Sequence, residues 1–274
     1  MFSSYTLKTE QSVIKLLQLT DQHLFQSEQA QLLGINTQAS FAQVLKEILQ
    51  QNQHFDAVLA TGDLVQDEST QGYLRLMEML KTLDTPTFWL PGNHDFQPKM
   101  VEILNSPPIY PMKHLLLGKY WQAILLDSQV FGVPHGELSA YQLAFLAQKL
   151  TEYPERFALV VLHHHIVPTR SAWLDQHNLR NPYDLFALLR KFPKVKGILY
   201  GHIHQQVDCQ WQGFHIMATP STCVQFKPDN NQFALDELQP GWREISLLPN
   251  GELETCVKRI QQVQFLPNLQ EEGY

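Results

Sequence analysis

Cysteine is scarce in this sequence, since only Cys209, Cys223 and Cys256 occur among 274 residues and they lie far apart. An odd number of scattered cysteines excludes a disulfide framework and a zinc cluster of the CxxC type. It favours reduced thiols in the cytoplasm. The sequence also lacks a leader of the signal-peptide type, and no apolar run approaches the ~20 residues that cross a bilayer. We therefore expect a cytoplasmic protein without a membrane partner.

Positive charge is also in short supply. The chain has 20 Lys and Arg against 27 Asp and Glu, a formal net charge of −7, and no basic cluster. Nucleic-acid binders usually carry a basic face, so we expect no nucleic-acid partner. No repeat or Pro/Gly/Ser-rich linker divides the chain, which favours a single domain over residues 1–274. The oligomeric state stays open.

Short apolar runs alternate with amphipathic segments along most of the chain. The runs favour strands because they are rich in β-branched and aromatic residues and bounded by Gly or Pro. They cover 13–19, 57–61, 87–90, 122–127, 157–162 and 197–200. The amphipathic segments predict helices over 40–52, 69–83 and 139–150, with Ser40 and Ser139 as N-caps. This alternation predicts a mixed α/β fold. The last part, 219–274, is strand-rich and would complete a second sheet or make contacts.

Histidine stands out, with 12 residues in the chain. Five of the apolar runs are followed directly by side chains that can bind metals, at the strand ends where open α/β sheets bind ligands. These are Asp21 and His23; Asp63; Asn93, His94 and Asp95; His163; and His202 and His204. Oxygen and imidazole donors without thiolate favour Mn²⁺, Fe²⁺ or Zn²⁺. The sequence therefore predicts a metal site at these ends.

The spacing suggests how these residues meet. The two members of the DxH pair, and those of the HxH pair, lie two residues apart, and in an extended segment such residues point to the same side. Asp63 stands alone, and its two carboxylate oxygens could bridge two cations. Among the three consecutive histidines, His163 follows its strand directly and is the expected ligand. His164 and His165 are more typical of supporting, substrate-facing or packed roles.

The ordered motifs DxH, GD, GNHD, H and GHxH resemble the signature of the calcineurin-like metallophosphoesterase family. Segments 34–37, 89–98, 125–139, 171–181 and 218–228 are similar to the bacterial 3′,5′-cyclic-AMP phosphodiesterases of that family. The resemblance implies a four-layer αββα sandwich of two mixed β-sheets, with a dimetal centre of iron or manganese at the strand ends. It implies a first metal on Asp21, His23 and His204, a second on Asn93, His163 and His202, and Asp63 as the bridge.

One position departs from the family pattern. Many members carry a second Asp three residues after the bridging one, where it supports the catalytic histidine. This chain has Gln66 there and Asp67 one residue later. Asp67 or Asp95 could orient His94, or neither could.

The resemblance implies hydrolysis of cyclic AMP to 5′-AMP by a hydroxide that bridges the two metals. His94, which follows Asn93, would contact the phosphate and either give a proton to the leaving 3′ oxygen or serve in phosphate binding alone. The substrate would lie against His23, Asp63, Asn93, His94 and His204. A metallophosphoesterase for another nucleotide phosphodiester or a dinucleoside polyphosphate is the alternative. A nuclease is disfavoured by the charge, and a non-catalytic scaffold by the complete ligand set. Candidates for base recognition are Ser221, Thr222, Phe226, Trp173, His177 and Asn178.

Overall fold

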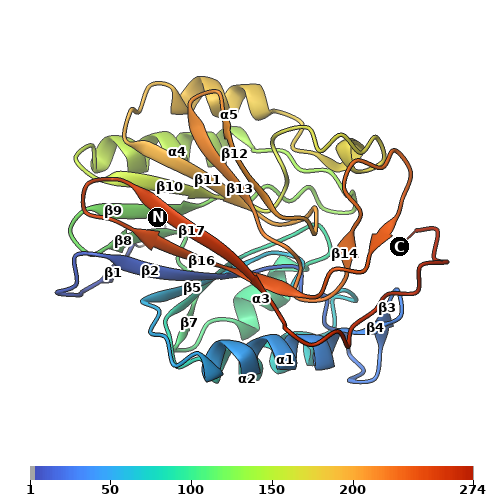
Figure 1. The fold of residues 1–274 in the computed structure, drawn as a ribbon. Coiled ribbons are helices and arrows are strands. Elements are labelled where there is room, and N and C mark those ends of the chain that lie inside the picture. The colour runs from blue at the N-terminus through green and yellow to red at the C-terminus, as the bar shows by residue number, and fades with distance from the viewer. Residues whose placement is uncertain (1–3, 274) are drawn as a thin grey trace.

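The computed structural model describes residues 4–273, and most of its strands form two large sheets (Figure 1). The seven-stranded sheet has the order β1 (Ser4–Leu7), β8 (His114–Leu117), β9 (Trp121–Leu125), β10 (Phe157–Val161), β11 (Val195–Tyr200), β13 (Phe214–Ala218) and β12 (Val207–Trp211). The six-stranded sheet has the order β17 (Leu253–Arg259), β16 (Gly241–Leu247), β2 (Ile14–Leu19), β5 (Ala57–Thr61), β6 (Thr87–Leu90) and β7 (Ile109–Tyr110). Two short ribbons pair β3 (Gln31–Leu32) with β4 (Ile35–Asn36) and β14 (Gln225–Phe226) with β15 (Leu235–Asp236). Both large sheets mix parallel and antiparallel neighbours.

The helices lie on the outer faces of the two sheets (Figure 1). They are α1 (Thr37–Gln50), α2 (Thr70–Lys81), α3 (Gln97–Ile103), α4 (Ala140–Glu152) and α5 (Pro182–Leu189), with a 3₁₀ turn at Leu174–His177. The first three cover the six-stranded sheet, and α4 and α5 cover the seven-stranded sheet. The predicted αββα sandwich is therefore confirmed. None of the helices within residues 4–273 is long and apolar enough to span a membrane.

Side chains of the central strands alternate between two cores. In β2, Leu17 and Leu19 pack under the helices, whereas Leu16 packs between the sheets. The same alternation places Leu59 of β5 in the inter-sheet core and Val58 in the helix-covered core. Because both faces are covered, these strands are apolar nearly throughout, as is typical of buried parallel strands.

The helix starts show which sequence signals were sufficient. Ser69 and Ser139 cap α2 and α4 by accepting a backbone N–H, as N-cap residues do. The prediction that Ser40 caps the first helix was wrong, because α1 begins at Thr37 and Asn36 accepts from the Ala39 amide. The Ser40 hydroxyl instead donates to the Thr222 carbonyl oxygen across 2.6 Å. The short helices α3 and α5 were not predicted.

The C-terminal strands complete the six-stranded sheet. Strand β16 pairs antiparallel with β2 on one side and with β17 on the other. Strand β2 is thereby internal, with β5 as its parallel neighbour. Its carboxyl end and those of β5, β6, β10 and β11 are where the predicted metal ligands follow.

Candidate metal centre

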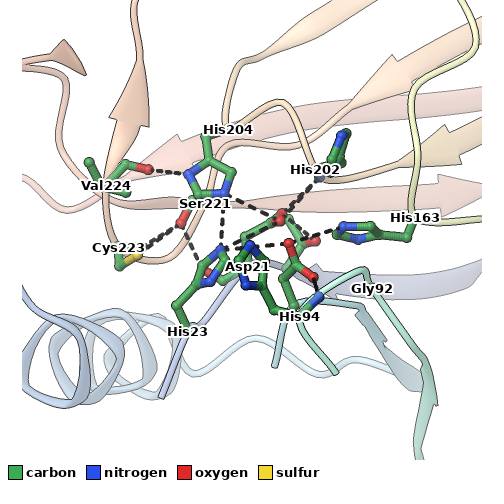
Figure 2. Close-up of polar contacts among 12 residues, drawn as sticks. Asp21, His23, Gly92, His94, His163, His202, His204, Ser221, Cys223 and Val224 are labelled. Carbon is green, nitrogen blue, oxygen red and sulfur yellow. Dashed lines mark hydrogen bonds and ion pairs between the residues drawn. The ribbon is translucent and has the colours of Figure 1, made fainter. Parts of the chain in front are cut away.

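The predicted ligands meet where loops from the two sheets come together (Figure 2). The loops after β2, β5 and β6 bring residues from one sheet, and those after β10 and β11 bring residues from the other. Each side chain follows its strand by two to four residues. The sandwich thus gathers residues that are up to 183 positions apart, from Asp21 to His204.

Asp21, His23 and His204 form the first group, and their ligand atoms all lie within 4.8 Å of one another. His23 Nε2 is 3.2 Å from His204 Nε2. His204 Nε2 is 3.4 Å from Asp21 Oδ1. All three side chains are fully buried. The structure therefore brings together the residues that the resemblance assigns to the first metal.

Asp63, His163 and His202 form a second group within the same limit. His163 Nε2 lies 3.2 Å from Asp63 Oδ2, and His23 Nε2 lies 3.9 Å from that same oxygen. Asp63 therefore stands between the two groups, where a bridging carboxylate must be.

Three atoms of this second group, Asp63 Oδ2, His163 Nε2 and His202 Nδ1, are buried and form no hydrogen bond among residues 4–273, although the first two lie 3.2 Å apart. Asn93 Oδ1, in the turn that packs on Asp63, is a fourth buried atom without a hydrogen bond. Buried polar atoms are nearly always paired, so these four need an explanation. All four can bind a cation. Asn93 thus has the free amide oxygen that its predicted role requires.

In each predicted ligand histidine, one ring nitrogen, the inner nitrogen, points into the group of ligands. The other, outer nitrogen faces an oxygen. His23 Nδ1 lies 2.5 Å from Gln66 Oε1, His163 Nδ1 2.8 Å from Thr61 O, His204 Nδ1 2.9 Å from Val224 O, and His202 Nε2 3.1 Å from His177 O. A carbonyl oxygen only accepts, so each of these nitrogens carries the proton. When the ring is neutral, the nitrogen on the other side presents a lone pair, which is the form of histidine that binds metals.

This arrangement fits two divalent cations. Inner nitrogens with lone pairs lie against each other and against two carboxylates, and such an array repels itself unless positive charge lies within it. The donors are oxygen and nitrogen in both groups, which suits borderline divalent ions. Asp21, His23 and His204 could hold one ion, and Asn93, His163 and His202 the other, with Asp63 shared.

The pKa values of the histidines differ because their neighbours differ. Burial lowers the pKa of His23 to about 3. Burial, with the neighbouring His164 next, holds the pKa of His202 well below its usual value. For His163, burial also opposes the charge, but the adjacent Asp63 carboxylate outweighs it and raises the pKa to about 9. Without a cation, His163 is therefore the ligand that keeps a proton near neutral pH.

The backbone at the ligands is not extended, which corrects the reasoning from side-chain alternation. Five ligands have positive φ values between 47° and 69°: Asp21, His23, Asp63, His202 and His204. This left-handed region is unfavourable for residues with a Cβ and is concentrated at functional sites. His202 and His204 belong to different groups rather than facing one site, so the two-residue spacing does not decide which group a residue joins. Asp21 and His23 do share one.

Gly92 permits the close approach of two loops. A Cβ at Gly92 would lie 2.1 Å from Asp63 Oδ1. That oxygen accepts the His94 backbone N–H at 2.9 Å. The GNHD turn therefore packs directly on the bridging carboxylate, which only a glycine allows.

The two acids considered for His94 both bind backbone amides. Asp95 is buried and accepts from Leu64, Val65 and Gly92 at 2.9–3.2 Å, and from the Tyr73 hydroxyl. Burial, together with Asp63, raises the pKa of Asp95 to about 7. Asp67 accepts from the amides of Gln26 and Ser69. Asp95 therefore joins the loop that carries Asp63 to the loop that carries His94.

Several base-recognition candidates support the ligands instead. Ser221 is fully buried and its hydroxyl donates to the Asp21 carbonyl oxygen at 2.7 Å. The Phe226 ring stacks on His204, with centroids 4.2 Å apart and planes 9° apart. Thr222 is fully buried, and Trp173, His177 and Asn178 are half-buried. Ser221 and Phe226 are thus not open to a base.

The remaining histidines of the 163–165 run lie behind the ligands. His165 stacks on His202, with centroids 5.5 Å and planes 17° apart, and its Nε2 is 3.5 Å from Asp175 Oδ1. His164 Nδ1 pairs with the Ser128 hydroxyl at 2.8 Å. Both residues are fully buried, so they pack as the sequence favoured.

Sequence reasoning missed the residues that orient the ligands. Thr20 donates its hydroxyl to Asp21 Oδ2 at 2.6 Å, and Gln66 faces His23. The glutamine at position 66, where many family members have aspartate, is a signal visible in the sequence. The carbonyls of Thr61, His177 and Val224 carry no sequence signal because every residue has one.

Residues 14–206 match the family model described as "Calcineurin-like phosphoesterase". The chain therefore belongs to this family of phosphoesterases. It is 63% identical over 274 residues to the 3′,5′-cyclic adenosine monophosphate phosphodiesterase CpdA of Haemophilus influenzae, covering 100% of both chains. It is 49% identical to the CpdA of Escherichia coli K12 over 95% of each chain, and 39% identical to that of Pseudomonas aeruginosa over 99% of this chain and 98% of the other.

Solved structures show the same fold at low sequence identity. A dimetal phosphatase from Danio rerio aligns with a TM-score of 0.62 and 14% identity, over 86% of this chain and 96% of the other. A purple acid phosphatase from yellow lupin aligns with a TM-score of 0.64 and 13% identity, over 94% of this chain and 53% of the other. At these identities the likeness concerns the fold alone.

Cation binding is expected to release a proton from His163. Near pH 7 this residue is protonated because its pKa is about 9, and a ligand must give up its proton. Titration of the metal-free protein with Mn²⁺, by calorimetry in buffers of different ionisation enthalpy, should show about one proton fewer released by His163→Asn than by wild type. The difference should vanish above about pH 10. Equal release from both proteins near pH 7 would contradict the assignment.

Proposed function

We propose that this chain hydrolyses 3′,5′-cyclic AMP to 5′-AMP. The observation that carries the proposal is the full-length identity of 63% to a relative whose name states that activity. The complete set of seven predicted ligands, together with His94, supports it, since a non-catalytic scaffold would not need to keep them.

The cations are proposed to be Fe²⁺ or Mn²⁺, held by the two groups described above. When bound, such ions supply Lewis acidity that stabilises negative charge on the phosphodiester and activates water. With two ions at +4, the Asp21 and Asp63 carboxylates bring the centre to about +2, or about +1 with a hydroxide, which suits a singly charged diester.

The residues around the phosphate are proposed to be His23, Asp63, Asn93, His94 and His204. His94 is the one whose ring is half-buried beside the first group, with its centroid 5.2 Å from that of His23. Its backbone is fixed on Asp63 Oδ1. Water attacks phosphorus in line, and a new P–O bond forms as the bond to the 3′ oxygen breaks. His94 donates a proton to that oxygen as it leaves, and the proton lost by the attacking water restores the His94 ring. The product is 5′-AMP.

The setting of the reaction follows from the same residues. We propose the cytoplasm as its compartment, because Cys209, Cys223 and Cys256 are free thiols. We propose no nucleic-acid partner, given the net charge of −7. We treat 1–274 as one catalytic domain, since β16 and β17 extend the sheet that carries Asp21 and Asp63.

The substrate assignment is tested by comparing hydrolysis of cyclic AMP, cyclic GMP, 2′,3′-cyclic AMP, diadenosine tetraphosphate and bis(p-nitrophenyl) phosphate by the Mn²⁺-loaded protein. We expect the highest kcat/KM with cyclic AMP and 5′-AMP as the product. A protein active on the other esters but inactive on cyclic AMP would reject the assignment and favour the alternative nucleotide substrates.

The role of His94 is tested by His94→Ala, with Asp63→Ala as the matched comparison. His94→Ala should retain both cations and lose about 10²–10⁴-fold in kcat, the usual contribution of a general acid. Asp63→Ala should lose both bound metal and turnover because the bridge is gone. Full activity of His94→Ala would remove it from the reaction.

The metal assignment is tested by elemental analysis of protein purified without added metal. We expect two equivalents of iron, manganese or a mixture in each chain, as the family resemblance implies, whereas imidazole and oxygen donors by themselves also suit zinc. Two equivalents of zinc, with activity that Fe²⁺ and Mn²⁺ cannot restore after chelation, would overturn this choice.

A further inference from the structure

Gln66 faces the outer nitrogen of a metal-binding histidine. Its Oε1 lies 2.5 Å from His23 Nδ1, and the His23 ring is fully buried. Position 66 is also where many family members carry a second Asp, three residues after the bridging one, so this chain has an amide in place of a carboxylate.

The backbone places Gln66 opposite His23. The loop after β2 and the loop after β5 run side by side through four hydrogen bonds of 2.8–3.1 Å: Asp21 N to Gly62 O, His23 N to Asp63 O, Leu24 N to Leu64 O, and Gln66 N to Leu24 O. This register is independent of the side chains. It brings the Gln66 amide to the His23 ring whenever the two loops are paired.

The amide oxygen determines the tautomer of His23. With Gln66 Oε1 as acceptor, Nδ1 carries the proton and Nε2 presents its lone pair to Asp21, His204 and Asp63. In the other three predicted ligand histidines, the corresponding ring nitrogen donates to a backbone carbonyl oxygen. His23 is the one ligand histidine whose hydrogen bond, in the contacts described above, comes from a side chain, so it is the one that a substitution can alter.

The amide also has no charge. Asp21 and Asp63 are both buried within 4.0 Å of His23 Nε2. A carboxylate at the half-buried position 66 would add a third negative charge beside the buried pair, which repulsion between like charges opposes. An amide fixes the tautomer without that cost, and it leaves the centre one unit more positive than a carboxylate would.

We propose that Gln66 is a positioning residue that sets the cation affinity of the first group by holding His23 as a neutral ligand. The proposal rests on the two-cation centre of the proposed function, but not on which phosphodiester is the substrate. Partners of this kind commonly contribute about 10–100-fold to metal affinity.

The test compares Gln66→Leu, Gln66→Glu and the control Asp67→Asn. Each protein, saturated with Mn²⁺, is dialysed against graded chelator, and bound metal is measured by elemental analysis. Gln66→Leu has no acceptor and should lose one of its two cations at about 10–100-fold lower chelator strength than wild type. Gln66→Glu keeps an acceptor at the same length and should retain both cations. Asp67→Asn, an exposed neighbour that binds only backbone amides in the contacts described, should stay within about twofold of wild type.

A second readout follows the tautomer itself. In protein loaded with diamagnetic Zn²⁺, ¹H–¹⁵N spectra should show His23 protonated at Nδ1 in wild type and in Gln66→Glu, with that resonance shifted or lost in Gln66→Leu. Equal metal retention by Gln66→Leu and wild type would overturn the proposal. So would a loss of the same size in Asp67→Asn, since the loop rather than the amide would then be responsible. These readouts do not depend on turnover, so a wrong substrate would leave them unchanged.

Discussion

The candidate metal centre brings buried carboxylate oxygens and imidazole nitrogens, all of them able to bind a cation, face to face. Two carboxylates and four imidazoles are buried in two adjoining groups, and the ligand atoms of each group lie within 4.8 Å of one another. Each imidazole ring is oriented by a hydrogen bond to a carbonyl oxygen on the side away from the centre. Asp63 lies near histidines of both groups. Such an arrangement is favourable only with positive charge at its middle. The rest of the fold serves to hold these acceptors against their own repulsion.

The two sheets provide the necessary rigidity. Ligands come from loops after five strands, and those loops are joined to each other by hydrogen bonds as well as to their strands. Asp95 links the loop after β5 with the GNHD turn, and Ser221 links the C-terminal part of the chain to Asp21. This cross-linking can sustain the left-handed backbone at five of the ligands, a conformation that costs of order 1–3 kcal/mol at each residue.

The sequence was sufficient for the central strands and for which residues gather, because each predicted ligand closely follows an apolar run, but not for the order of the strands in the sheets or for short strands such as β7 and β8. It was also sufficient for α2 and α4, whose serine caps precede clear amphipathic stripes. It was insufficient where long-range contacts decide. Ser40 looked like a cap but is held by Thr222, 182 positions away. The left-handed backbone at these residues and the carbonyls behind the histidines leave no residue pattern, so the separation of His202 from His204 was expected from the family resemblance and not from the spacing of the pair.

The strand β16 has a consequence for how much of the chain the chemistry requires. All seven predicted ligands lie within residues 14–206, the part that matches the family model. Without the residues that follow, however, β2 would become an edge strand, because its antiparallel neighbour is β16. His204 would also lose the Val224 carbonyl, and Asp21 the Ser221 hydroxyl. The stretch that contains every ligand is therefore shorter than the stretch that can hold them in position, and a fragment cut at the motif boundary would have the composition of the site without its geometry.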